Sequence, residues 1–146
     1  MTPTDETVNE RTESISFDFD LPHPPEKVWR ALTTPALLAE WLLPVIGLEL
    51  EPGAAFTFRA PPQPEWDGTV NCRMLEIEER RRLRYAWIVG DIDTVVTFTL
   101  APTESGTRLS IVQSGFKSRQ KRNVAGARYG WKVMGGKLVE LLERTS

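Results

Sequence analysis

The sequence feature that most constrains the fold is a change of hydrophobic period near the C-terminus. From residue 124 onward, apolar residues recur at intervals of 3, 4, 3, 4 and 3, namely Val124, Ala127, Trp131, Met134, Leu138 and Leu141. This spacing predicts a helix of about six turns with one apolar stripe. Such a helix is stable only if another layer of the protein covers the stripe.

The segments before this helix have the pattern of β-strands. Ile15, Phe17, Phe19 and Leu21 alternate with serine and aspartate, which predicts a strand with one buried face. Five further segments resemble strands separated by turn-forming residues, the first of them interrupted by a Pro-Gly turn: 46–60, 69–79, 82–90, 94–102 and 106–116. Because consecutive strands joined by tight turns pair in opposite directions, we expect an antiparallel meander.

Two short helices are predicted between the first strand and the rest of the sheet. Pro24 and Pro25 suit the first turn of a helix, where no backbone donor is needed. A second helix follows Thr34-Pro35 and ends before Pro44. The order of elements predicts an α+β fold, in which a curved antiparallel sheet of six or seven strands wraps around the C-terminal helix.

Length and charge place the chain among ordinary globular domains. Its 146 residues predict a single domain over residues 15–146, after a polar tail at 1–14 that we expect to be disordered. A net charge of −2 disfavours nucleic acid and anionic membranes as partners. No apolar run is long enough to cross a bilayer, and the N-terminus does not have the pattern of a signal peptide. The single cysteine fits a reducing compartment, so we expect a cytoplasmic protein.

Residues with catalytic or metal-binding chemistry are few and isolated. His23 lies at a strand–helix junction with no carboxylate or nucleophile placed beside it, and we interpret it as an exposed junction residue. Cys72 lies inside a strand and is interpreted as a buried, unreactive thiol. Asp91 and Asp93 fit a hairpin turn better than a cation site. The sequence has no zinc, nucleotide or Ser-His-Asp motif, so we predict no catalytic residues, no metal and no cofactor.

The predicted C-terminal helix carries residues that are unfavourable in an isolated helix. Gly126, Gly130, Gly135 and Gly136 each cost about 1 kcal/mol relative to alanine. We interpret them as sites of tight packing on the sheet, with close approach of a ligand or partner as the alternative. The basic run at residues 117–122 puts cations at the helix start, against the helix dipole. It is either a solvated loop, the reading we favour, or a site for a partner or an anion.

Several motifs occur in an order that resembles a known family. They read HPPEKVWRALTTPALLAEWLLP, EPGAAFTFR, WDGTVNCRMLEIEERRRLRYAW, GTRLSIVQSGF and YGWKVMGGKLVELLE. Together they resemble the START-like (SRPBCC) superfamily, and within it the branch named after the activator of the heat-shock protein 90 ATPase. The resemblance covers residues 15–144 and implies a helix-grip fold, also called Bet v 1-like. Gln113 stands where relatives often carry histidine or glutamate, so no acid–base role is carried over to it.

The candidate site consists mainly of aromatic residues on elements expected to face the interior. With polar residues that can converge on them, the set is Trp41, Phe58, Arg59, Trp66, Tyr85, Trp87, Phe98, Gln113, Tyr129, Trp131 and Met134. These side chains either line an apolar cavity, the usual form of a small-molecule site, or fill the interior themselves.

The resemblance favours a cavity and therefore a non-catalytic binder of a hydrophobic small molecule, such as a lipid, sterol or polyketide. One alternative is an ATPase activator that associates with a chaperone or another protein. The other alternative is an enzyme of the cyclase type. The fold alone does not distinguish between these three functions.

Overall fold

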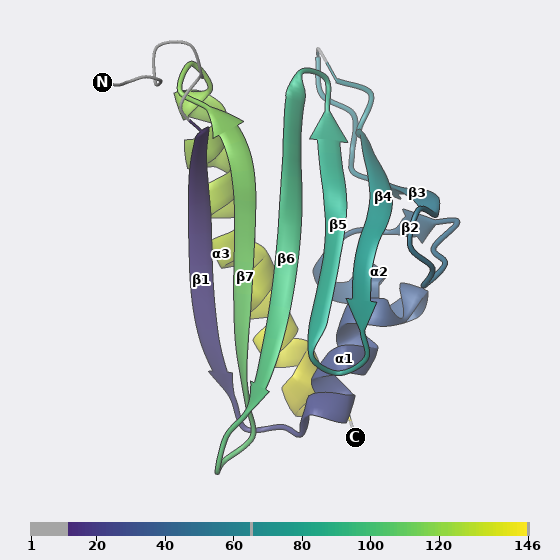
Figure 1. The fold of residues 1–146 in the computed structure, drawn as a ribbon, viewed down its shortest axis with the longest axis vertical. Helices are drawn as coiled ribbons and strands as arrows, with labels where there is room; N and C mark the ends of the chain where they lie inside the picture. Colours follow the sequence, from purple (N-terminus) through teal and green to yellow (C-terminus); the bar gives the residue numbers. More distant parts are fainter. Residues whose placement is uncertain (1–11, 65, 146) are drawn as a thin grey trace.

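The computed structural model describes residues 12–64 and 66–145, and its main layer is a seven-stranded antiparallel sheet (Figure 1). The strands lie in the order β1-β7-β6-β5-β4-β3-β2. Their bounds are β1 Thr12–Leu21, β2 Val45–Ile46, β3 Ala55–Arg59, β4 Thr69–Glu78, β5 Arg82–Val89, β6 Ile92–Pro102 and β7 Thr107–Lys117. Strands β2 to β7 form the predicted meander, and β1 pairs with β7.

Three helices complete the fold: α1 (Pro25–Thr33), α2 (Pro35–Trp41) and α3 (Lys121–Arg144). Helix α3 lies across one face of the sheet behind β1, β7 and β6, and α1 and α2 lie near its C-terminal end (Figure 1). This arrangement confirms the predicted α+β helix-grip fold, with two short helices after the first strand.

Strand β1 begins at Thr12, three residues before the predicted start of the domain at residue 15. Residues 12–14 therefore belong to the sheet, where Ser14 pairs with Ser114 across β7. The rest of the predicted disordered tail lies outside the described residues.

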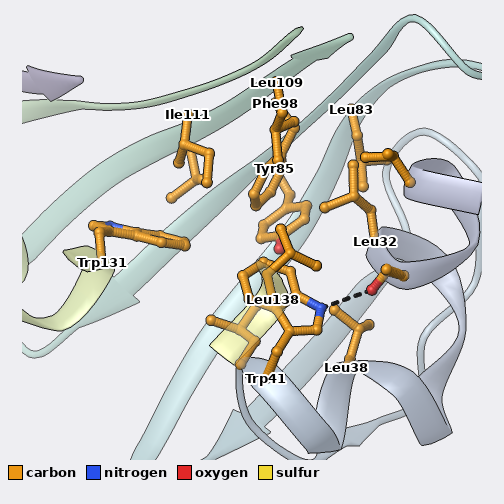
Figure 2. Packing of buried hydrophobic residues seen from close by; sticks show 14 of the residues in the cluster. Leu32, Leu38, Trp41, Leu83, Tyr85, Phe98, Leu109, Ile111, Trp131 and Leu138 are labelled. Carbon is orange, nitrogen blue, oxygen red and sulfur yellow. Dashed lines mark hydrogen bonds between the residues drawn. The ribbon is translucent and has the colours of Figure 1, made fainter. Parts of the chain in front are cut away.

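The core lies between the sheet and α3. Alternation along the strands puts one set of side chains on the face that α3 covers; on β6 these are Thr94, Val96, Phe98 and Leu100. From the other side, α3 buries Val124, Trp131, Gly135, Leu138, Leu141 and Leu142. Figure 2 shows side chains of both layers and of α1 and α2 meeting in one apolar cluster.

Helices α1 and α2 close one end of this core. Each has proline in its first turn, as predicted, and Val28 and Trp29 of α1 are buried. Trp41, at the end of α2, is 1% exposed, and its Nε1 donates a hydrogen bond to the Ala31 carbonyl oxygen over 2.8 Å (Figure 2). Trp41 therefore joins the two helices and fills the space between them and α3.

The start of α1 also holds the C-terminal end of α3. Lys27 Nζ donates to the carbonyl oxygens of Leu142 and Thr145, each at 2.6 Å, and lies 3.2 Å from His23 Nδ1. A cation is favourable at a helix C-terminus, where carbonyl groups lack partners within the helix. His23 is half-buried rather than exposed as predicted, and burial followed by the Lys27 charge lowers the pKa of its imidazole.

The glycines of α3 differ in what surrounds them. A Cβ at Gly135 would lie 2.4 Å from Phe19 Cζ, so Gly135 is the site of tight helix-on-sheet packing that the sequence indicated. A Cβ at Gly136, by contrast, would meet no atom within 4 Å. Tight packing therefore explains Gly135 and does not explain Gly136.

Alanine at position 136 is expected to raise the free energy of unfolding by about 1 kcal/mol, because it removes the helix cost of glycine without a clash. Urea denaturation measures this change. Gly135→Ala is the matched control, since it gains the same helix propensity but must displace the Phe19 ring. Equal stabilisation by both substitutions would contradict the difference in packing.

Candidate functional site

The candidate site is a pocket under the N-terminal half of α3, with a volume of about 480 Å³. Its lining residues come from α3, β5, β6 and β7 and from the loops after α2 and β3: Leu43, Trp66, Trp87, Val89, Ile92, Gln113, Phe116, Arg122, Asn123, Gly126, Ala127, Gly130, Trp131 and Met134. We call it the α3 pocket. Most of these residues are apolar, and the few polar ones suit the orientation of a small molecule.

Two other hollows lie on outward-facing surfaces. One, of about 420 Å³, includes Asn71 and Arg73 on β4, and the other, of about 440 Å³, includes Glu78 and Arg81 at the turn after β4. All four of these residues are exposed. Because the lining of the α3 pocket contains many more large apolar side chains than either of these hollows, it is the better candidate for apolar binding.

The α3 pocket exists because part of α3 carries almost no side-chain bulk. Gly126, Ala127 and Gly130 line it from the helix. A Cβ at Gly126 would meet no atom within 4 Å, and one at Gly130 would meet only Met134 Cε, at 3.7 Å. The favoured interpretation of tight packing on the sheet is therefore wrong for Gly126 and Gly130, where the small residues leave open space.

Tryptophans form much of the pocket wall. The rings of Trp87 on β5 and Trp131 on α3 lie with centroids 5.7 Å apart and an interplanar angle of 49°. Trp66 comes from the loop between β3 and β4, and its Nε1 donates to the Thr69 carbonyl oxygen over 2.8 Å. This bond holds the loop against the sheet and helps to fix one side of the pocket.

A β-bulge lets Gln113 and Phe116 line the same pocket. Residues three apart in a regular strand point to opposite faces of the sheet. Here the pairing with β1 shifts between Glu13 and Ser14, opposite Gly115, whose φ is +109°. Glycine tolerates this conformation, and the extra residue returns Phe116 to the inner face.

A chain of hydrogen bonds fixes the polar part of the pocket. Trp131 Nε1 donates to Gln113 Oε1 over 2.8 Å, Gln113 Nε2 donates to Thr94 Oγ1 over 2.9 Å, and the Thr94 hydroxyl donates to the Trp87 carbonyl oxygen over 2.8 Å. Because an indole N–H can only donate, the first bond fixes which end of the Gln113 amide is oxygen. Gln113 keeps a second N–H, for which the described residues supply no acceptor.

The structure divides the predicted site residues into three groups. Five line the α3 pocket: Trp66, Trp87, Gln113, Trp131 and Met134. Four lie in the core, each at most 2% exposed: Trp41, Phe58, Tyr85 and Phe98. The Tyr85 ring, for example, lies 5.7 Å from Phe98 and 6.0 Å from Phe58 between centroids. The interior is thus filled with side chains toward α1 and α2 and open under the first half of α3.

The remaining two predicted residues, Arg59 and Tyr129, point away from the interior. Tyr129 is 72% exposed, because it lies two positions from Trp131 and so outside the buried stripe of α3. Arg59 follows the buried Phe58 on β3 and is exposed, with its guanidinium donating to Thr69 Oγ1. The expectation that Tyr129 faces the interior, and that Arg59 converges on the site, is wrong.

The buried side chains of Cys72 and Tyr85 are poorly suited to a role in catalysis. Burial raises the pKa of the Cys72 thiol to about 12, so the thiolate is scarce at neutral pH. Burial also raises the pKa of Tyr85, whose hydroxyl has no hydrogen-bond partner in the described part of the chain. Among residues 12–64 and 66–145, no cluster of His, Cys, Asp or Glu could hold a metal ion.

Sequence reasoning missed nine of the pocket residues: Leu43, Val89, Ile92, Phe116, Arg122, Asn123, Gly126, Ala127 and Gly130. For some of them a signal was present. Gly126 and Gly130 stood out as costly in a helix, and Arg122 belonged to a basic run at the wrong end of the helix dipole. The sequence alone does not show that these residues surround one pocket.

Comparison with known proteins gives one family and many similar folds. The sequence model of the family described as "Activator of Hsp90 ATPase homolog 1-like protein" matches residues 22–143. The search of curated proteins gave no match. In the described part of the chain, no helix combines the length and the hydropathy needed for a bilayer span.

Solved structures of bacterial proteins share the fold along almost the whole chain. Protein MLL2253 from Mesorhizobium loti is 38% identical, with a TM-score of 0.85 over 92% of this chain and 99% of the other. Protein CV1439 from Chromobacterium violaceum is 30% identical, with a TM-score of 0.73 over 90% and 98%. Protein BH1534 from Bacillus halodurans is 27% identical, with a TM-score of 0.75 over 92% and 99%.

Proposed function

The chain belongs to the activator of Hsp90 ATPase homolog 1-like family, as its motifs predicted, and we propose that it is a non-catalytic binder of a hydrophobic small molecule in the α3 pocket. The family alone does not select this function, because one fold hosts many activities. The observation that supports it is the pocket of about 480 Å³ with its mainly apolar lining. Pockets of this size and composition commonly hold lipids, drugs and other small apolar molecules.

Affinity would come mainly from removal of apolar surface from water, at roughly 25 cal/mol for each Å² buried. The rings of Trp66, Trp87 and Trp131 offer flat surfaces against which a ligand can pack. The unused N–H of Gln113 can donate to a carbonyl or hydroxyl oxygen of the ligand and so set its orientation.

The two alternative functions have less support. A cyclase-type enzyme needs groups that move protons, yet the described residues that line the pocket include no His, Cys, Tyr, Lys or carboxylate. An ATPase activator needs a surface for its partner, and only the family description favours that role. The proposal also places the protein in the cytoplasm, because its single thiol fits a reducing compartment.

NMR of ¹⁵N-labelled indoles tests the proposal with neutral probes: a sterol, a long-chain lipid and an aromatic polyketide. Binding is expected to shift the indole signals of Trp66, Trp87 and Trp131, which line the pocket. Trp29 and Trp41 are buried in the α1–α2 end of the core and serve as internal controls. Absence of any shift at the three pocket tryptophans with every probe would refute the function.

A pair of substitutions on α3 shows whether the shifts come from the pocket. Gly126→Leu puts a side chain into the lining and is expected to weaken binding at least about fivefold, because crowding of a ligand by added side-chain bulk costs about 1–3 kcal/mol. Gly136→Leu adds the same bulk to an exposed part of the helix, where a Cβ meets nothing within 4 Å. Equal loss of affinity in both variants would assign the binding to another place.

A further inference from the structure

The α3 pocket has an unbalanced positive charge. Among the described residues that line the pocket, Arg122 is the one charged side chain, and none of them is a carboxylate. The chain as a whole has a net charge of −2, so this local excess does not reflect its overall composition. An ionised group at an apolar pocket favours a ligand with the opposite charge at the matching place.

Arg122 pairs with no acidic side chain of the described residues. It is exposed at the start of α3, and no ion pair joins it to a carboxylate in residues 12–64 or 66–145. Asp91, in the turn between β5 and β6, pairs with Arg119 at 3.7 Å, and its carbonyl oxygen accepts a bond from Gln120 Nε2. Asp93 is exposed and precedes the buried Thr94 on β6, so its side chain points to the outer face of the sheet.

The position of Arg122 is also unfavourable for the helix itself. The first turn of α3 contains Lys121 and Arg122 and no acidic residue. Each cation there costs about 0.3–1 kcal/mol against the helix dipole at low ionic strength. Arg122 therefore opposes helix stability at the edge of an apolar pocket, and an anion bound beside it would remove this penalty.

From these observations we infer that the ligand of the α3 pocket is an amphipathic carboxylate, an inference that rests on the proposed function. Its carboxylate binds the Arg122 guanidinium, which presents paired donors to two oxygens, and the Asn123 amide can add a third donor. Its apolar body lies deeper, against Trp66, Trp87 and Trp131. One guanidinium in the lining matches a single negative charge, which favours a carboxylate over a doubly charged phosphate.

Matched acids and amides test this inference: 2-naphthoate against 2-naphthamide, and decanoate against decanamide. The two members of each pair have nearly the same shape and differ in charge. In the native chain, followed by the indole signals of Trp87 and Trp131, each acid that binds is expected to bind about tenfold tighter than its amide, as for a partly exposed charged hydrogen bond. Higher salt should weaken binding of the acid and leave the amide unchanged.

Two arginine substitutions separate a local contact from overall charge. Arg122→Gln is expected to abolish the preference for the acid while the affinity for the amide is kept. Arg128→Gln removes the same charge from an exposed position of α3 outside the pocket and should preserve the preference. Equal affinity for acid and amide in the native chain, or loss of the preference in both variants, would overturn the inference and leave the proposed function standing. No indole shift with any acid or amide, or with the neutral probes above, would overturn both.

Discussion

Replacing Gly106 with alanine is expected to lower the free energy of unfolding by about 3 kcal/mol, the upper part of the range for a forced backbone shift. Gly106 lies in the turn between β6 and β7, which packs against the link from β1 to α1. A Cβ there would lie 2.1 Å from the Leu21 carbonyl oxygen and 2.6 Å from the His23 nitrogen. Both are backbone atoms, so no side chain can rotate away to relieve the contact.

Urea denaturation of Gly106→Ala measures the loss, and Gly90→Ala is a suitable control. Gly90, in the turn between β5 and β6, also has a positive φ, +60°, but a Cβ there meets no atom within 4 Å. Alanine at position 90 pays only the conformational cost of about 1–2 kcal/mol. A loss at position 106 no larger than the loss at position 90 would show that the turn yields more easily than its contacts indicate.

Trp41→Ala is expected to be the most destabilising of the side-chain truncations, with a loss of about 4 kcal/mol. Trp41 is 1% exposed, and it fills the space where α1, α2 and α3 meet. Removal of the indole leaves a cavity there and frees the Ala31 carbonyl oxygen from its bond to Nε1. The same denaturation experiment measures the loss.

Two further variants test the reason for this loss. Trp41→Phe keeps an aromatic ring and should cost less than alanine, because it leaves a smaller cavity. Tyr129→Ala removes a comparable side chain that is 72% exposed, and it should change stability by no more than about 0.5 kcal/mol. If Trp41→Ala were as mild as Tyr129→Ala, the α1–α2 end of the core could not be as closely packed as the contacts imply.

The fold was predictable because its signals are local. Period-two alternation in β1 and the long apolar stripe of α3 each depend on spacing along the chain, and both are present in the structure. Prolines marked the starts of α1 and α2 for an equally local reason, since the first turn of a helix needs no backbone donor. The same local spacing also predicts the outward orientation of the two residues that were wrongly assigned to the site. Arg59 follows the buried Phe58 on its strand, and Tyr129 lies outside the apolar stripe of α3.

The pocket was less predictable because it depends on which side chains meet in space. Tyr85 and Trp87 are two residues apart on β5, so both point to its inner face. Of the two, only Trp87 lies opposite the small residues of α3 and lines the pocket. Phe116 reaches the pocket through a bulge that its own strand pattern does not announce. The volume of the pocket is the small difference between the space that the fold encloses and the space that its side chains occupy. A sequence pattern does not determine such a difference.

The unequal attachment of α3 along its length has a consequence for its motions. Its C-terminal half is held by the two bonds from Lys27, by the 2.8 Å contact between Arg144 and Glu40, and by the fit of Gly135 on Phe19. Its first turns bury Val124, but Gly126, Ala127 and Gly130 there face the open space of the α3 pocket. Local unfolding therefore costs least in the part of the helix above the pocket. We therefore expect that a large ligand can enter the pocket by local unfolding of these turns, while the rest of the domain keeps its native packing.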